Sequence, residues 1–185
     1  MRLTEQVHAN LRERLRSGDF AIDATVGNGH DTVLLAELVE PRGNIHGFDI
    51  QQEALLNTRQ LLELETPEAE VVLHLAGHET MDLHLPPEFL GNTTAVVFNL
   101  GYLPGSDKSR ATKMETSLSA LKLSWEKYLR SGGILSVLCY PDHPGGKEET
   151  EAVAEWFERL EVDFERHPTT GPVLFLVTKP LGTTF

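Results

Sequence analysis

The stretch VDFERHPTTGPVLFLVTKP, residues 162–180, contains two strand-like runs that are separated only by the turn-forming letters PTTG. Because no helical pattern lies between the two runs, they are expected to pair as an antiparallel hairpin. Earlier in the chain, five short and mostly apolar runs are flanked by Gly, Asn or Pro, which is typical of strands. These runs are residues 20–26, 44–50, 70–77, 94–100 and 132–140.

Helical patterns alternate with the five early runs, for example at residues 31–40, 51–65 and 112–130. Such alternation indicates a parallel sheet that is covered by helices on both faces. The predicted fold is therefore α/β, with a doubly wound, mainly parallel seven-stranded sheet whose last strand is antiparallel. Ligands of such sheets bind beyond the carboxyl ends of the strands.

All of residues 1–185 are expected to form one domain, with an amphipathic helix within 1–18 and a short tail at 181–185. The charged amino terminus is unlike a secretory signal, and no segment approaches the ~20 apolar residues of a membrane span. We therefore expect a cytoplasmic protein with no membrane partner. The single cysteine, Cys139, excludes an intramolecular disulfide and a multi-cysteine metal site, and no metal is expected.

The formal net charge of −12 argues against a polyanionic partner, because phosphate binding relies on Lys and Arg. The basic residues are nevertheless concentrated in the amino-terminal helix and between residues 104 and 130. A nucleic-acid partner therefore stays open, as does the simpler interpretation that these are solvated helix faces. A homodimer would present two such basic surfaces, and we include it as an expectation.

The turn after the first strand is DATVGNGHD, residues 23–31. Gly27 and Gly29 match the first two glycines of the dinucleotide fingerprint G-x-G-x-x-G, but Thr32 occupies the third position, which disfavours a nicotinamide cofactor. A plain tight turn remains an alternative. The predicted sheet resembles that of S-adenosylmethionine-dependent methyltransferases, in which an acidic residue ends the first strand and small residues follow. Asp23 would then face the cofactor's ammonium group, directly or through water.

The second and third strands end in residues that suit a nucleoside. Asp49 lies twenty residues after Gly29, where an acidic side chain can accept both ribose hydroxyls, and Gln51 is within reach of the same ribose. His78 and Glu79 follow the third strand, at the expected position of an adenine. Methyltransferases and dehydrogenases share this arrangement, so it indicates adenosine without choosing a reaction.

The fourth strand runs into VVFNLGYLPG, residues 96–105. Asn99 and Tyr102 resemble the ends of the N-P-P-Y motif of amino-group methyltransferases, with Leu100 and Gly101 in place of the prolines. In those enzymes the Asn amide accepts a hydrogen bond from the target amine and the aromatic ring stacks on the base. Methyl transfer needs the nitrogen lone pair in line with the methyl group, so Asn99 and Tyr102 are candidate catalytic residues.

Four motifs together resemble a small bacterial family long labelled rRNA methylases and now associated with tRNA 5-aminomethyl-2-thiouridine methyltransferases. The motifs are DATVGNGHDT (23–32), GFDIQ (47–51), NLGYLPGSDKS (99–109) and YPDHPGGKEE (140–149). The resemblance runs from Gly18 to Pro180. It implies an enzyme that uses S-adenosyl-L-methionine to N-methylate the aminomethyl group of the tRNA wobble uridine, with the anticodon loop as its partner.

The same resemblance implies roles for individual residues. Cofactor binding falls on Gly27, Asn28, Gly29, His30, Asp31, Asp49, Gln51, His78 and Glu79. Lys and Arg suit phosphate contact, while Tyr102 suits stacking on an unstacked base. For His143 a role as proton acceptor is an alternative to substrate contact, and it needs a neutral imidazole. Substrate binding falls on Pro104, Gly105, Lys108, Arg110, His143 and Lys147.

Other functions stay open from the sequence. The overall acidity favours a methyltransferase for a small-molecule amine, and rRNA is a further acceptor. A nicotinamide-binding or non-catalytic nucleotide module is a third class, and binding of NAD without S-adenosylmethionine would identify it. Carbon methylation through Cys139 is disfavoured, because a lone cysteine after an apolar strand is usually a small buried residue.

Overall fold

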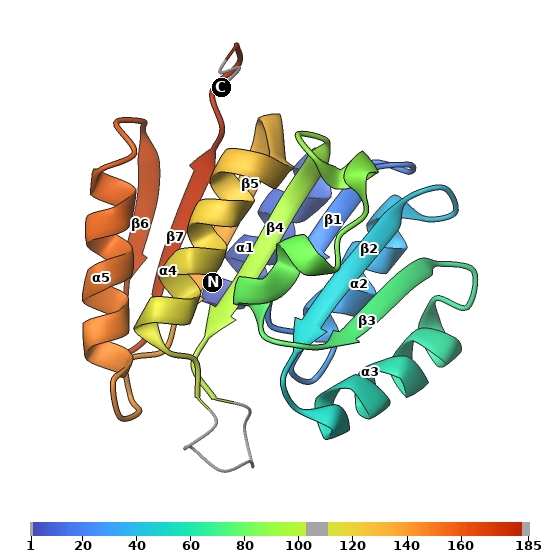
Figure 1. Ribbon diagram of the computed structural model, residues 1–185, viewed down its shortest axis with the longest axis horizontal. Helices are drawn as coiled ribbons and strands as arrows, with labels where there is room; N and C mark the ends of the chain where they lie inside the picture. Colours follow the sequence, from blue (N-terminus) through green and yellow to red (C-terminus); the bar gives the residue numbers. More distant parts are fainter. Residues whose placement is uncertain (1, 103–110, 183–185) are drawn as a thin grey trace.

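Seven strands form a single sheet in the order β3-β2-β1-β4-β5-β7-β6 (Figure 1). The computed structural model describes residues 2–102 and 111–182, so four predicted substrate residues, Pro104, Gly105, Lys108 and Arg110, lie outside the described residues. The strands are β1 (Phe20–Asp23), β2 (Asn44–Asp49), β3 (Glu70–Leu75), β4 (Thr93–Leu100), β5 (Leu129–Cys139), β6 (Phe164–Pro168) and β7 (Val173–Thr178).

The strand directions confirm the predicted mixed sheet. β1 pairs in parallel with β2 and β4, and β3 and β5 continue the parallel part on either side. β7 is antiparallel to both β5 and β6, so the closing hairpin forms as expected. The chain builds outward from β1 to β3 and then returns to β4, which makes the gap beyond β1 and β4 the switch point where ligands of open α/β sheets bind.

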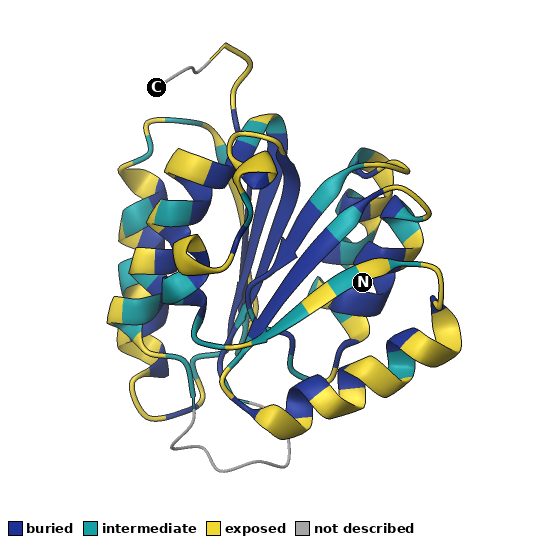
Figure 2. Cartoon of the chain, turned by 45° about the vertical axis from the view of Figure 1, so that its right-hand side comes forward, coloured by how far each residue is buried: buried dark blue, intermediate teal, exposed yellow. Residues whose placement is uncertain are grey.

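Helices cover both faces of the sheet, and each face has its own apolar cluster (Figures 1 and 2). One cluster packs Leu121 and Phe157 against the strands, and the other packs Leu11, Leu35 and Leu62. The central strands are accordingly buried along most of their length (Figure 2). The α-helices are α1 (Leu3–Arg14), α2 (His30–Val39), α3 (Gln52–Glu65), α4 (Met114–Leu123) and α5 (Gly146–Glu158), with short 3-10 segments η1 (His78–Leu83) and η2 (Pro87–Phe89).

The helix expected over residues 112–130 is shorter than predicted. α4 ends at Leu123, a π-helical turn, η4 (Ser124–Tyr128), follows, and β5 begins at Leu129. The buried ammonium of Lys179 donates to the carbonyl oxygens of Trp125 (2.6 Å) and Leu129 (2.9 Å), which satisfies carbonyls that a continuing helix would have bonded. This contact from the far end of the chain lies where the helical segment gives way to β5.

None of the helices in residues 2–102 and 111–182 is long and apolar enough to cross a bilayer. Within the same residues, no group of three or more His, Cys, Asp or Glu side chains converges in a way that could hold a metal ion.

Candidate active site

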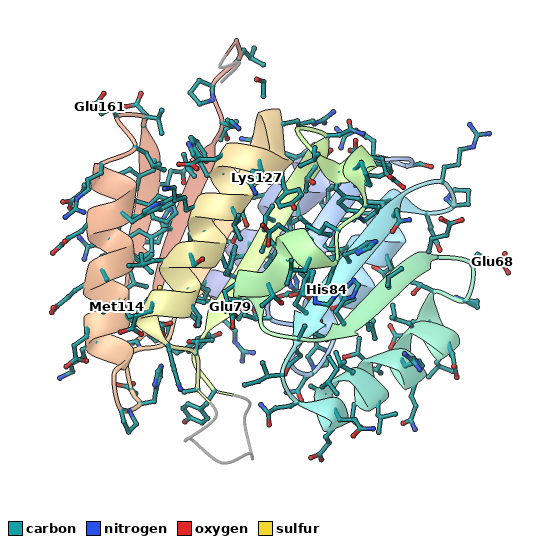
Figure 3. The ribbon with its side chains drawn as sticks, in the orientation of Figure 1. Glu68, Glu79, His84, Met114, Lys127 and Glu161 are labelled. Carbon is teal, nitrogen blue, oxygen red and sulfur yellow. The ribbon has the colours of Figure 1, made fainter. Side chains whose placement is uncertain are left out.

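A cavity of about 880 Å³ lies at the carboxyl ends of the central parallel strands. Its size falls within the range of roughly 300–1,000 Å³ that small-molecule sites occupy. Figure 3 labels Glu79 at the start of η1 and Met114 at the start of α4, both toward the edge where these strands end. Eleven residues predicted from the sequence line the cavity: Gly27, Asn28, Gly29, His30, Asp31, Asp49, Gln51, His78, Glu79, Asn99 and Tyr102.

The turn between β1 and α2 depends on its two glycines. Gly27 and Gly29 have φ angles of +52° and +81°, which lie in the left-handed region. A Cβ atom on Gly29 would also lie 2.5 Å from the hydroxyl oxygen of Thr58 on α3. Glycine therefore allows α2 to begin close to α3 while the backbone of residues 27–29 stays open to the cavity.

Asp23 does not take the position expected from the sequence. Its side chain is fully buried and does not line the cavity. The carboxylate accepts hydrogen bonds from the Thr32 hydroxyl (2.6 Å) and the Thr25 backbone N–H (3.1 Å). Burial, reinforced by the nearby Asp31 carboxylate, raises the pKa of Asp23 to about 7. Asp23 therefore braces the turn from behind, and its contact with a ligand ammonium, directly or through water, stays a prediction.

Asp49 and Gln51 lie at the end of β2, as predicted. The Asp49 carboxylate accepts from the backbone N–H of Gly27 (2.9 Å) and from that of Gln51 (2.8 Å). Each carboxylate oxygen has more than one acceptor site, so Asp49 can still accept from hydroxyl groups in the cavity. The same side chain therefore links the first turn to the second and faces the space where a ribose is expected.

His78 lines the cavity and has one buried ring nitrogen without a partner among the described residues. Its Nδ1 lies 3.1 Å from the Ala24 carbonyl oxygen, and since a carbonyl only accepts, Nδ1 carries the proton. Burial lowers the pKa of His78, which favours the neutral ring. Its Nε2 is buried and has no hydrogen-bond partner among the described residues. An amino group of a ligand, such as the exocyclic amine of adenine, is the kind of donor that this atom lacks.

Asn99 is held through two of its atoms, and one of its partners, Asp31, contacts a histidine that the sequence did not predict. Its backbone N–H donates to the Thr25 hydroxyl (2.6 Å), and its side-chain Nδ2 donates to Asp31 Oδ2 (2.7 Å). The other oxygen of Asp31 lies 2.6 Å from Nε2 of His8, on α1. Burial acts to raise the pKa of Asp31, but the hydrogen bonds from His8 and Asn99 outweigh it, and the pKa lies below its usual value.

The predicted residues of the YPDHPGGKEE loop do not join the cavity. The His143 side chain is fully enclosed: its ring contacts the Tyr102 ring edge-on, with centroids 6.1 Å apart, and its Nε2 lies 3.8 Å from Glu149. The His143 ring thus packs against Tyr102 in this structure, and the expected RNA contact through His143 stays a prediction. Lys147 is exposed at the start of α5 and does not line the cavity either.

Cys139 is buried at the end of β5, where burial raises the pKa of its thiol far above neutrality. A thiol in this environment stays protonated at neutral pH and is a poor nucleophile. The geometry therefore supports the expectation that this cysteine is a packing residue.

The strand order, the antiparallel β7 and the cavity beyond β1 and β4 together define a Rossmann-like methyltransferase fold. The sequence also matches a family model described as "Putative rRNA methylase" over residues 45–167. The chain belongs to this family.

Individual relatives agree with the assignment. The chain is 38% identical over 167 residues to an Arabidopsis thaliana protein named tRNA (mnm(5)s(2)U34)-methyltransferase, chloroplastic; the match covers 86% of this chain and 60% of that protein. A solved structure from Clostridium thermocellum, described as a "putative rRNA-methylase", is 37% identical with a TM-score of 0.85, and the match covers 95% of this chain and 96% of that one. A Streptococcus mutans protein solved in complex with SAH is 34% identical with a TM-score of 0.84, covering 97% and 98%.

Proposed function

We propose that the protein is an S-adenosylmethionine-dependent methyltransferase that N-methylates the aminomethyl group of 5-aminomethyl-2-thiouridine at the wobble position of tRNA. The observation that carries the proposal is the meeting, in one cavity, of an adenosine-type cradle with the Asn99–Tyr102 turn. The Arabidopsis relative supports the tRNA acceptor, and the Streptococcus mutans relative, which holds SAH, supports the cofactor.

The cavity residues fit the cofactor's parts. Asp49 would accept from the ribose hydroxyls, and the unpartnered Nε2 of His78 would accept from the adenine amine. The open backbone of residues 27–29 would face the methionine end. S-adenosylmethionine would supply a methyl group on its sulfonium, and a C–N bond would form as the C–S bond breaks and a thioether remains.

Asn99 would orient the acceptor amine. Because its Nδ2 donates to Asp31, its Oδ1 is the amide atom left to accept from the amine. An alkyl amine is mostly protonated at neutral pH, so the site would select the neutral minority and align its lone pair with the methyl group. The secondary ammonium that forms would release its extra proton to water. Tyr102 would stack on the splayed-out base.

A second candidate acceptor is a small-molecule amine, which the net charge of −12 favours because an acidic protein attracts cations and repels RNA. With a tRNA substrate, we further propose a cytoplasmic location and a homodimer that presents two basic surfaces. Light scattering across a concentration series would measure the oligomeric state.

The test of function uses S-adenosylmethionine with a labelled methyl group. The protein would be incubated separately with under-modified tRNA, with rRNA and with a small alkyl amine. We expect label in the tRNA and its loss in Asn99→Ala, which should still bind the cofactor. Label transferred only to the small amine would support the second candidate. Calorimetric binding of NAD but not S-adenosylmethionine would overturn the assignment to methyltransferases.

A further inference from the structure

The first helix reaches the cavity, although its sequence pattern indicates only an amphipathic helix. Thr4 and His8 lie one turn apart on α1, and both line the cavity. On another side of the same helix, Val7 and Leu11 are 3% and 0% exposed in the apolar cluster beneath. This packing fixes the helix against the sheet, so the position of His8 relative to β4 is fixed too.

Hydrogen bonds connect His8 to Asn99 through one carboxylate. His8 Nε2 lies 2.6 Å from Asp31 Oδ1, and Asn99 Nδ2 lies 2.7 Å from Asp31 Oδ2. The low pKa of Asp31 keeps it ionised at neutral pH, and an ionised carboxylate only accepts. Both neighbours must therefore donate: His8 with an Nε2–H, and Asn99 with its NH₂ group.

A carboxylate held by a single partner can rotate and take other partners. Asp31 is held at both oxygens and is only 14% exposed, so neither bond is easily exchanged for water. Asp31 is also the second residue of α2, where the helix dipole favours a negative charge. The carboxylate thus has a single well-defined orientation, and that orientation decides which way the Asn99 amide is turned.

We propose that His8 is a positioning residue of the methyl-transfer site, which orients the Asn99 amide through Asp31 so that Asn99 Oδ1 faces the acceptor amine. The proposal rests on the proposed function, because it assigns a role in the same reaction. Without the His8 donor, Asp31 would gain rotational freedom, its hydrogen bond to Asn99 Nδ2 would no longer hold the amide in one place, and Asn99 Oδ1 would be aligned with the acceptor amine for less of the time.

The test compares two substitutions at His8 with a control on the same helix. His8→Phe keeps a ring but removes the donor, and His8→Gln keeps a donor near the position of Nε2. Glu13→Gln changes an exposed residue of α1. We expect His8→Phe to lower kcat about tenfold while the dissociation constant of S-adenosylmethionine stays unchanged. His8→Gln should restore most of the rate, and Glu13→Gln should match the wild type.

Coupling to Asn99 separates positioning from general support of the fold. In an Asn99→Ala background, His8→Phe should cause no further loss of kcat, because residues that act as a unit are not additive. A full tenfold loss in that background would overturn the proposal. So would a wild-type kcat in His8→Phe. If His8→Phe does not fold, His8→Leu removes the same donor.

A readout that needs no activity uses the free protein labelled with ¹⁵N. The side-chain amide signals of Asn99, identified by their absence in Asn99→Ala, should shift in His8→Phe but stay in place in His8→Gln and Glu13→Gln. Unchanged signals in His8→Phe would contradict the positioning role even if the enzyme were inactive. Conversely, a wild-type protein that transfers no methyl group would refute the proposed function, while the amide signals would still test the link from His8 to Asn99.

Discussion

Replacing Asp23 with Asn should change the pH dependence of stability and leave cofactor binding intact. Burial, together with the Asp31 carboxylate, raises the pKa of Asp23 from 3.8 to about 7 in the folded protein. The folded state therefore holds this proton more tightly than the unfolded state does. Between about pH 4 and 7 the unfolded state binds fewer protons, so the free energy of unfolding falls as the pH rises. Asparagine has no proton to lose and removes this contribution.

The size of the effect follows from the two pKa values. One pKa unit corresponds to about 1.4 kcal/mol, so the rise from 3.8 to about 7 corresponds to about 4 kcal/mol over the full pH window. About 2 to 3 kcal/mol of this change falls between pH 5 and pH 8, since the remainder is already lost below pH 5. Asparagine can still accept one hydrogen bond, and the Thr32 hydroxyl can turn to accept from its amide, which adds an offset that is independent of pH.

The assay is urea unfolding of the wild type, Asp23→Asn and the control Glu53→Gln, which removes an exposed acid on α3, at about pH 5, 6.5 and 8. The other titrating groups cancel when each variant is compared with the wild type. From pH 5 to pH 8 the difference in free energy of unfolding between Asp23→Asn and the wild type should change by about 2 to 3 kcal/mol in favour of Asp23→Asn. The corresponding difference for the control should stay constant. A difference that does not change with pH would refute the raised pKa of Asp23. A large loss of cofactor affinity in Asp23→Asn would indicate that Asp23 contacts the cofactor.

Three further substitutions test other parts of the site. Asp49→Ala should raise the dissociation constant of S-adenosylmethionine by about tenfold or more in calorimetry, with kcat at saturation little changed; an unaltered constant would contradict the ribose assignment. Gly29→Ala should lower the free energy of unfolding by about 2 kcal/mol, and adding Thr58→Ala should recover part of it, whereas a neutral Gly29→Ala would argue against the tight packing of α2 on α3. Cys139→Ala should keep its methyl-transfer rate within about twofold, and loss of turnover would revive a thiolate mechanism.

The sheet and most of the cavity could be predicted from the sequence, because both follow from local patterns. Short apolar runs between turn residues define the strands, and the helix-free gap at PTTG specifies an antiparallel hairpin. Residues at the carboxyl ends of neighbouring parallel strands must meet at one edge, so Gly27, Asp49, His78 and Asn99 come together in the cavity as expected.

The direction of individual side chains could not be predicted in this way. Asp23 and His143 are polar residues at the correct edge of the sheet, yet both point into the protein. Asp23 is hydrogen-bonded to Thr32, and the His143 ring packs against the Tyr102 ring. A sequence pattern gives the position of a residue along a strand or loop, whereas partners distant in sequence decide which way it turns.

His8 was missed for a related reason. Helical spacing identifies Val7 and Leu11 as the buried face of α1, but the place where that helix packs depends on tertiary contacts. A histidine next to a buried valine carries no local sign that it will meet the first residues of α2. The contact between His8 and Asp31 can be seen only in the folded structure.

The central claim is methyl transfer to the aminomethyl nitrogen of the wobble uridine, and mass spectrometry of tRNA nucleosides tests it most directly. Under-modified tRNA would be incubated with the protein and S-adenosylmethionine, digested and compared with a sample containing Asn99→Ala. The account predicts that 5-aminomethyl-2-thiouridine is converted to the nucleoside that is heavier by one CH₂ group, and that Asn99→Ala slows this conversion about a hundredfold. If wild-type protein that binds S-adenosylmethionine leaves this nucleoside unchanged, the account is contradicted.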